Sequence, residues 1–169
     1  YDANAPGEPL LSVVGLGKRG NFKDISFTLH KGEVLGITGL VGSGRTELAQ
    51  ALFGSNQPDE GKIYLDGRAV SIASTSQAVK MGIGYVPENR KIEGLALDKT
   101  LEENATITIV DGIKNSFGLV DENKRRQIAE HWMDKLHITP PYPDMPIGNF
   151  SGGNQQKAVI AKWLACELR

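Results

Sequence analysis

A glycine-rich loop lies between a predicted strand and a predicted helix. The stretch Gly39–Thr46 reads Gly-Leu-Val-Gly-Ser-Gly-Arg-Thr and follows a short apolar, partly β-branched run at Val34–Thr38, which predicts a buried strand. Apolar residues then recur at helical spacing through Arg45–Phe53. In this setting glycines let backbone N–H groups turn toward an anion, and the start of the helix presents its positive end to the same anion. The alternative is a turn whose glycines serve backbone geometry alone.

The residue types in this loop specify the chemistry further. Its spacing fits G-x-x-x-x-G-K-[ST], except that Arg45 stands where the lysine is expected. A guanidinium can still meet a phosphate, although not as a compact point charge. Thr46 supplies a hydroxyl where a magnesium ligand is needed. The loop therefore predicts a phosphate site.

A second helix start has a similar character about a hundred residues later. Ser151 can cap a helix over 158–167, and Gly152 and Gly153 leave the backbone bare at its first turn. By itself, Ser-Gly-Gly before a helix is an ordinary capping turn. Two helix starts of this kind in one chain, one of them after a glycine-rich loop, favour phosphate binding over a chance occurrence.

Composition restricts the class of protein. With 169 residues, 40% of them hydrophobic, the chain can bury one core, so we expect one domain or most of one. A net charge of −1 with both signs mixed disfavours nucleic acid or an anionic membrane as the main partner. The single Cys166 leaves no intrachain disulfide. No signal peptide or membrane-spanning apolar run is found, which favours a cytosolic chain.

The first half of the chain predicts mainly strands. Tyr1–Pro9 is polar and proline-containing, as in a linker, and Leu10–Val14 predicts a strand. Gly15–Asn21 is glycine-rich and basic, which predicts a loop, and the alternation in Phe22–Leu29 predicts a half-buried strand. The aromatic ring of Phe22 could stack on a nucleotide base, although packing in the core is the more common role.

The middle of the chain predicts a hairpin and then another strand. Asp66-Gly67 joins Lys62–Leu65 to Arg68–Ile72, which is a strong hairpin pattern. After a short helix from Thr75, the apolar run Ile83–Val86 predicts a strand. Glu88 would then follow the carboxyl end of that strand, where open α/β sheets place ligand-contacting groups.

The second half predicts helices. Thr100 and Glu103 form a capping-box pattern at the start of one helix. Asp121 can cap another helix that continues to about Leu136. The proline-rich run Pro140–Pro146 predicts an irregular connector.

These motifs resemble those of the ATP-binding cassette proteins of ABC transporters. Gly39–Thr46 is similar to their Walker A loop, Tyr85–Arg90 to their Q-loop region, and Asn149–Lys157 to their signature, L-S-G-G-Q. The strings G-R-T-E, Y-V-P-E, S-G-G-N-Q-Q-K and A-K-W-L are most similar to the second cassette of tandem-cassette proteins in bacterial importers of ribose, galactose or arabinose type. The resemblance covers nearly the whole chain after the linker.

The resemblance implies an α/β fold: a P-loop NTPase cassette core with an antiparallel β subdomain and a helical subdomain. Residues 10–169 would be a partial nucleotide-binding domain, with a helical insert over about 100–148. The sequence ends at Arg169, before the family's Walker B strand and catalytic Glu, so we expect an incomplete cassette that does not hydrolyse ATP alone and assign it no catalytic residue. Glu88 replaces the family's usual Gln, and with Arg45 this suggests a specialised half-site.

The resemblance also implies a function, namely coupling of ATP binding and hydrolysis to monosaccharide import. The implied cofactors are ATP and Mg²⁺, with Thr46 and Glu88 near the metal. The implied partners are a second ATP-binding cassette and membrane permease subunits, at the inner face of the cell membrane. Two alternatives remain: a non-hydrolysing regulatory module and a soluble cassette ATPase that acts on DNA. The residues expected to contact nucleotide are Phe22, Gly39, Gly42, Ser43, Gly44, Arg45, Thr46, Glu47, Glu88, Ser151, Gly152 and Gly153.

Overall fold

The computed structural model describes residues 7–166 and residue 168, and the chain divides into two compact units, 1–78 and 79–169. Most of the linker predicted at Tyr1–Pro9 lies outside the described residues, and Pro9 already belongs to the first strand.

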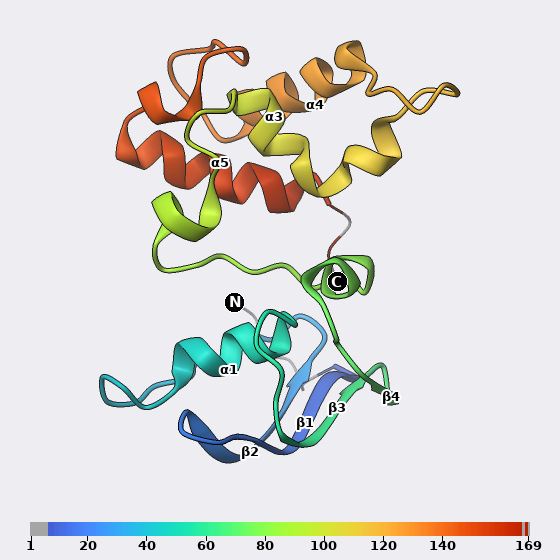
Figure 1. Ribbon diagram of the computed structural model, residues 1–169, viewed down its shortest axis with the longest axis vertical. Helices are drawn as coiled ribbons and strands as arrows, with labels where there is room; N and C mark the ends of the chain where they lie inside the picture. Colours follow the sequence, from blue (N-terminus) through green and yellow to red (C-terminus); the bar gives the residue numbers. More distant parts are fainter. Residues whose placement is uncertain (1–6, 167, 169) are drawn as a thin grey trace. The chain divides into compact units, whose positions relative to one another are not determined.

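The first unit contains a four-stranded antiparallel sheet in the order β2-β1-β3-β4 (Figure 1). The strands are β1 (Pro9–Lys18), β2 (Phe22–His30), β3 (Glu60–Leu65) and β4 (Arg68–Val70), and the helix is α1 (Arg45–Leu52). Helix α2 (Thr75–Lys80) begins in this unit and ends in the second. Helix α1 contacts β2. The side chains buried in this unit include Val13, Leu16, Leu48, Ala51 and Ile63.

The predicted hairpin is confirmed. Asp66 and Gly67 have φ angles of 47° and 73°, as the tight turn between β3 and β4 requires. The predicted loop at Gly15–Asn21 starts too early, because β1 continues to Lys18. Gly15 has a φ of 59° at a β-bulge, and this extra residue lets the strand continue so that Leu16 is buried.

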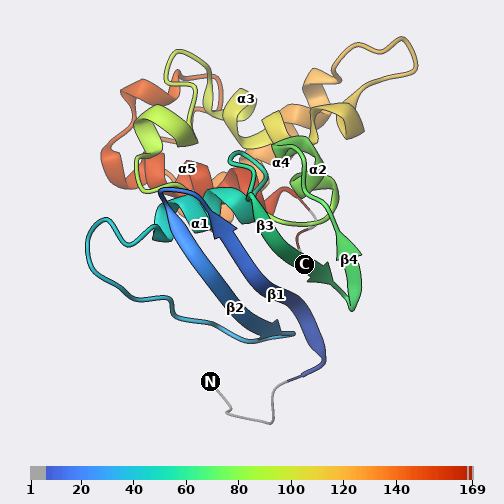
Figure 2. The same ribbon diagram turned by 60° about the horizontal axis from the view of Figure 1, so that its bottom comes forward.

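The buried strand predicted at Val34–Thr38 is wrong. This segment belongs to none of the four strands of the sheet, and its side chains are exposed, with Val34 at 79% and Ile37 at 49%. Figure 2 shows the whole connection from β2 to α1 as a long loop outside the sheet. An apolar, β-branched sequence favours a strand, but a strand is stable only when it pairs with neighbouring strands. In this unit the strands pair with one another and not with Val34–Thr38.

The second unit is helical. It contains a π-helical turn, η1 (Arg90–Gly94), the helices α3 (Leu101–Thr106), α4 (Glu122–Lys135) and α5 (Gly152–Leu164), and the 3₁₀ turns η2 (Ile107–Ile113) and η3 (Ile147–Asn149). Helix α3 packs against both α4 and α5, around a core that includes Leu101, Ala105, Ala129, Ile147, Ala158 and Val159 (Figure 1).

Local capping explains where these helices begin. The Thr100 hydroxyl accepts from the Glu103 N–H and the Glu103 carboxylate accepts from the Thr100 N–H, so the predicted capping box is confirmed. The Asp121 carboxylate caps α4 by accepting from the Lys124 N–H. None of the helices in the described part of the chain is long and apolar enough to span a membrane.

The strand predicted at Ile83–Val86 is also wrong. The segment has no regular secondary structure, and Val86 is 56% exposed. A Cβ atom on Gly84 would lie 3.1 Å from Cε3 of Trp163, so the segment packs against α5 instead of a sheet. An apolar run is not stable as a strand without partner strands. In the second unit this run packs against helix α5 instead.

Candidate functional site

The glycine-rich loop ends at a helix start that has no side-chain cap. Gly42 and Gly44 both have φ angles of 82°, a left-handed conformation that glycine adopts without strain. Gly44 is the N-cap of α1, and its carbonyl oxygen accepts the first helical hydrogen bond from the Leu48 N–H at 2.8 Å. Because glycine has no side-chain oxygen, the first N–H groups of α1 remain available to an anion.

Two close contacts hold this loop in shape. A Cβ atom on Gly44 would lie 2.5 Å from the carbonyl oxygen of Asn21, so the loop packs directly on the turn between β1 and β2. A Cβ atom on Gly39 would lie 2.6 Å from Oγ of Ser43, so this hydroxyl folds back over the start of the loop. At Gly44 the neighbour is backbone, so only a glycine leaves room there, whereas at Gly39 the Ser43 side chain would have to move.

The polar side chains of α1 begin immediately after the loop. Arg45 and Thr46 are exposed, and Glu47 is half-buried. Arg45 makes no ion pair with any described residue. A guanidinium and a hydroxyl thus stand at the positive end of a helix, where a phosphate would meet both.

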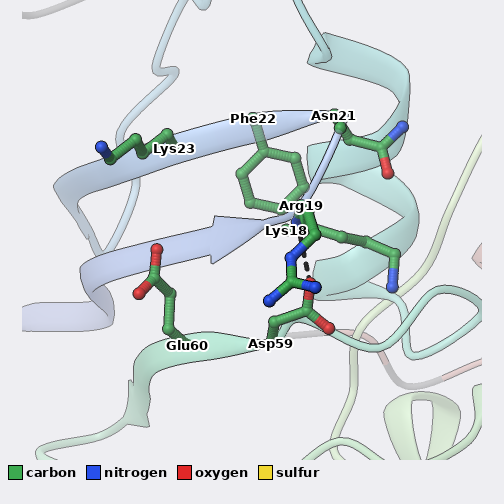
Figure 3. A pocket seen from close by; sticks show the side chains of 8 residues that line it. Lys18, Arg19, Asn21, Phe22, Lys23, Asp59 and Glu60 are labelled. Atoms are coloured by element: carbon green, nitrogen blue, oxygen red, sulfur yellow. Dashed lines mark hydrogen bonds between the residues drawn. The ribbon is translucent and has the colours of Figure 1, made fainter.

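A cavity of about 750 Å³ lies beside this helix start. It is lined by Lys18–Lys23 and by Asp59 and Glu60 (Figure 3). The Arg19 backbone N–H donates to the Asp59 carboxylate at 2.8 Å, which fixes the turn but leaves the Arg19 side chain exposed. Phe22 also lines the cavity but is only 8% exposed, so most of its ring is packed in the core.

The Ser-Gly-Gly segment caps α5 in the second unit. The Ser151 hydroxyl accepts from the Asn154 N–H at 3.4 Å, and the Asn154 side chain also donates to the Thr139 carbonyl. Ser151, Gly152 and Gly153 are all exposed. The first turn of α5 is therefore accessible, and it is tied to the loop at Thr139.

The family follows from comparison with known proteins. A family model described as "ABC transporter" matches residues 22–169, which is most of the chain. The chain belongs to the ABC transporter family. After the family motifs that they resemble, Gly39–Thr46 is called the Walker A loop and Asn149–Lys157 the signature segment from here on.

Curated relatives are found among sugar-import proteins. The chain is 45% identical over 160 residues to a putative ribose/galactose/methyl galactoside import ATP-binding protein 1 of Agrobacterium fabrum, covering 95% of this chain and 32% of that protein. It is 44% identical over 163 residues to the ribose import ATP-binding protein RbsA of Geobacillus kaustophilus, covering 96% of this chain and 33% of the relative. The chain thus spans about a third of the length of these relatives.

Solved structures confirm the cassette fold. A dimeric post-hydrolysis structure of the ATP-binding cassette MJ0796 matches with a TM-score of 0.71 and 20% identity, over 92% of this chain and 69% of that chain. The structure of cbiO1 from Clostridium perfringens matches with a TM-score of 0.70 and 22% identity, over 95% and 62%. The α/β cassette class predicted from the sequence is confirmed.

The remaining predicted residue of this ABC cassette is Glu88. It is exposed and follows the buried Pro87, whereas Asn89 caps η1 by accepting from the Lys91 N–H at 3.2 Å. Thr46 belongs to the first unit and Glu88 to the second, so their joint role at a metal ion stays a prediction. Within the described residues, no group of three or more His, Cys, Asp or Glu side chains could hold a metal ion.

One residue near the signature segment was not among the predicted nucleotide contacts. Nη2 of Arg90 lies 2.7 Å from the point where a Cβ atom on Gly152 would stand. Arg90 is part of the string Tyr85–Arg90 that resembles the Q-loop region, but its sequence position gives no indication that it reaches α5. Only the packing of η1 on α5 brings it there.

Proposed function

We propose that this chain is the nucleotide-binding part of an ATP-driven monosaccharide importer. The observation that carries the proposal is the Walker A loop itself, with left-handed Gly42 and Gly44 leading to an uncapped helix start at Arg45. The names of the relatives, which are ribose and galactose import ATP-binding proteins, support sugar import as the process served.

The phosphates of ATP would bind to the backbone amides of 42–46. Arg45 adds an exposed positive charge, and the Thr46 hydroxyl provides an oxygen donor for Mg²⁺. The donor set fits this metal, because Mg²⁺ prefers oxygen ligands and commonly binds through one or two protein groups together with substrate phosphates. Mg²⁺ would neutralise the negative charge of the β- and γ-phosphates. Glu47 carries a negative charge in the first turn of α1.

The nucleoside would occupy the cavity lined by Lys18–Lys23. Because Asn21 touches Gly44, a nucleotide whose phosphates lie at the start of α1 has its base near this turn. The exposed guanidinium of Arg19 is planar and can stack on a base. Phe22 was a candidate for stacking on the base, with core packing as the more common role, and it is only 8% exposed.

The signature segment would act on a second nucleotide. Ser151, Gly152 and Gly153 present a hydroxyl and bare N–H groups at the start of α5, which suits the γ-phosphate of ATP held by a partner cassette. Binding of ATP would close the two cassettes, and hydrolysis would release them and drive permease subunits at the inner face of the membrane. Phosphoryl transfer depends mainly on positioning and charge stabilisation, which these elements supply.

A second candidate function is a regulatory module that binds ATP without hydrolysing it. It is favoured by Arg45, which stands in the place of the Walker A lysine, and by Glu88 in the place of glutamine.

Titration calorimetry with MgATP tests the proposed function. The chain should bind ATP, and Gly44→Val should abolish binding, because the valine side chain would displace the Asn21 carbonyl and block the loop. Gly36→Ala is the matched control, since a Cβ atom there meets nothing within 4 Å. Equal binding by Gly44→Val and wild type would show that the nucleotide lies elsewhere.

A further inference from the structure

The segment that carries Glu88 runs along the signature helix α5. A Cβ atom on Gly84 would lie 3.1 Å from Cε3 of Trp163, and one on Gly94 would lie 3.2 Å from Cγ2 of Val159. Both glycines therefore allow the backbone to approach α5 more closely than other residues would. The segment before and after Glu88 is thus packed on the same helix.

The side chain of Lys162 contacts the C-terminal end of this segment. Its side chain is only 8% exposed, and Nζ donates to the Gly94 carbonyl at 2.7 Å, at the C-terminal end of η1. No described acidic residue forms an ion pair with it. Burial lowers the pKa of the Lys162 ammonium. An uncharged side chain of the same size would pack without this desolvation cost. The specific contributions of the lysine are therefore the hydrogen bond to Gly94 and the cation–π contact of Nζ with the Trp163 ring, whose centroid lies 5.0 Å away.

Arg90 is the first residue of η1, and its side chain contacts the N-terminal end of α5. Its Nη2 lies 2.7 Å from the position of a Cβ atom on Gly152, whereas a Cβ atom on Gly153 would meet nothing within 4 Å. Nε of Arg90 is buried and has no hydrogen-bond partner among the described residues. The guanidinium is therefore packed against the backbone of the signature.

We propose that Arg90 and Lys162 are positioning residues that hold the segment 87–94 on α5. The two contacts lie at opposite ends of α5, next to Gly152 and beyond Val159. Together they hold the segment that carries Glu88 in a fixed position relative to the start of α5 at Ser151. The segment and the start of α5 therefore move as one rigid body. The catalytic consequence rests on the proposed function: a reaction that depends on positioning is sensitive to such a fixed geometry.

Hydrogen exchange measured by mass spectrometry on the full chain tests the Lys162 contact. Lys162→Met should speed exchange in peptides covering 87–95 by about tenfold, because one buried hydrogen bond is lost. Exchange within the middle of α5 should change by less than about twofold. Lys157→Met is the matched control: Lys157 also lies on α5 and also donates to a carbonyl at 2.7 Å, that of His137. It should leave 87–95 unchanged, and equal effects of the two variants would overturn the proposal.

A double-mutant cycle tests the Arg90 contact and does not require Lys162 variants to fold. Gly152→Ala should lower the thermal midpoint below that of Gly153→Ala, because only the first places a methyl group against the guanidinium, which must then shift. In an Arg90→Ala background the two alanine variants should melt at the same temperature. If the two alanine variants still melted at different temperatures in the Arg90→Ala background, contact with Arg90 would not be the cause of the lower stability of Gly152→Ala.

The steady-state kinetics of the intact transporter separate this inference from the proposed function. Lys162→Met should lower kcat for ATP hydrolysis by about tenfold and leave KM for ATP within about twofold, since the Walker A loop is unchanged. An unchanged kcat in a transporter that hydrolyses ATP would overturn the positioning role. Failure of the wild-type protein to bind ATP would overturn the proposed function. The exchange and melting results would still show whether the Lys162 and Arg90 contacts hold the segment on α5.

Discussion

The carbonyl oxygen of Asn21 lies 2.5 Å from the position that a Cβ atom on Gly44 would occupy. This contact joins the last residue of the Walker A glycines to the turn between β1 and β2. The loop is thus shaped by the antiparallel sheet as well as by its own sequence, and the cavity beside it shares the same turn.

A glycine series should separate backbone strain from overlap. Gly44→Ala should destabilise the chain by roughly 3 kcal/mol, because it combines a left-handed φ with the overlap against Asn21. Gly42→Ala should cost only about 1 kcal/mol, because the φ is the same but the surrounding space is open. Urea unfolding of both variants beside Gly36→Ala measures the order, and equal costs at 42 and 44 would contradict it.

Arg19 should contribute to nucleotide affinity through the base. Arg19→Ala is expected to weaken ATP binding about tenfold, the typical loss for one stacking contact. Lys62→Ala removes the same charge from β3 outside this cavity and should change affinity by less than about twofold. Calorimetric titrations of ATP and of tripolyphosphate provide the check. If Arg19→Ala weakened both ligands equally, Arg19 would act on phosphate and not on the base.

Thr46 should determine the magnesium dependence of binding. In wild type, ATP affinity should rise when Mg²⁺ is added, because the hydroxyl at the start of α1 supplies a metal ligand. Thr46→Ala should remove most of this rise and leave binding of metal-free ATP nearly unchanged. Titrations with and without a chelator measure both quantities, and a full magnesium effect in Thr46→Ala would exclude the hydroxyl as a ligand.

The capping box at Thr100 should make stability depend on pH. The hydrogen bond from the Thr100 backbone N–H, followed by the charge of Lys99, lowers the pKa of the Glu103 carboxyl. A depressed folded-state pKa gives stability that is present above the unfolded value of about 4.3 and is lost as pH falls through the folded value. Glu103→Gln should cost about 0.5 kcal/mol at pH 7 and nothing near pH 2. Urea midpoints across this range test it, and parallel curves for the two proteins would contradict the linkage.

Local sequence determined the features that need only neighbouring residues. Thr100 with Glu103 and Asp121 with Lys124 satisfy helix N–H groups within one turn, so their capping was readable from spacing. Asp66 and Gly67 both adopt the positive φ of a tight hairpin turn. Glycines before Arg45 likewise indicated a loop able to turn its amides toward an anion, because that ability belongs to glycine itself.

Tertiary structure decided which apolar runs became strands and which polar groups met. Val34–Thr38 and Ile83–Val86 have strand-like sequences but belong to no described strand, because strand stability comes from pairing with segments that are distant in sequence. The contact of Arg90 with Gly152 and the hydrogen bond from Lys162 to Gly94 join residues 62 and 68 positions apart. Such contacts depend on how α5 packs on η1, and packing of this kind leaves no periodic pattern in the sequence.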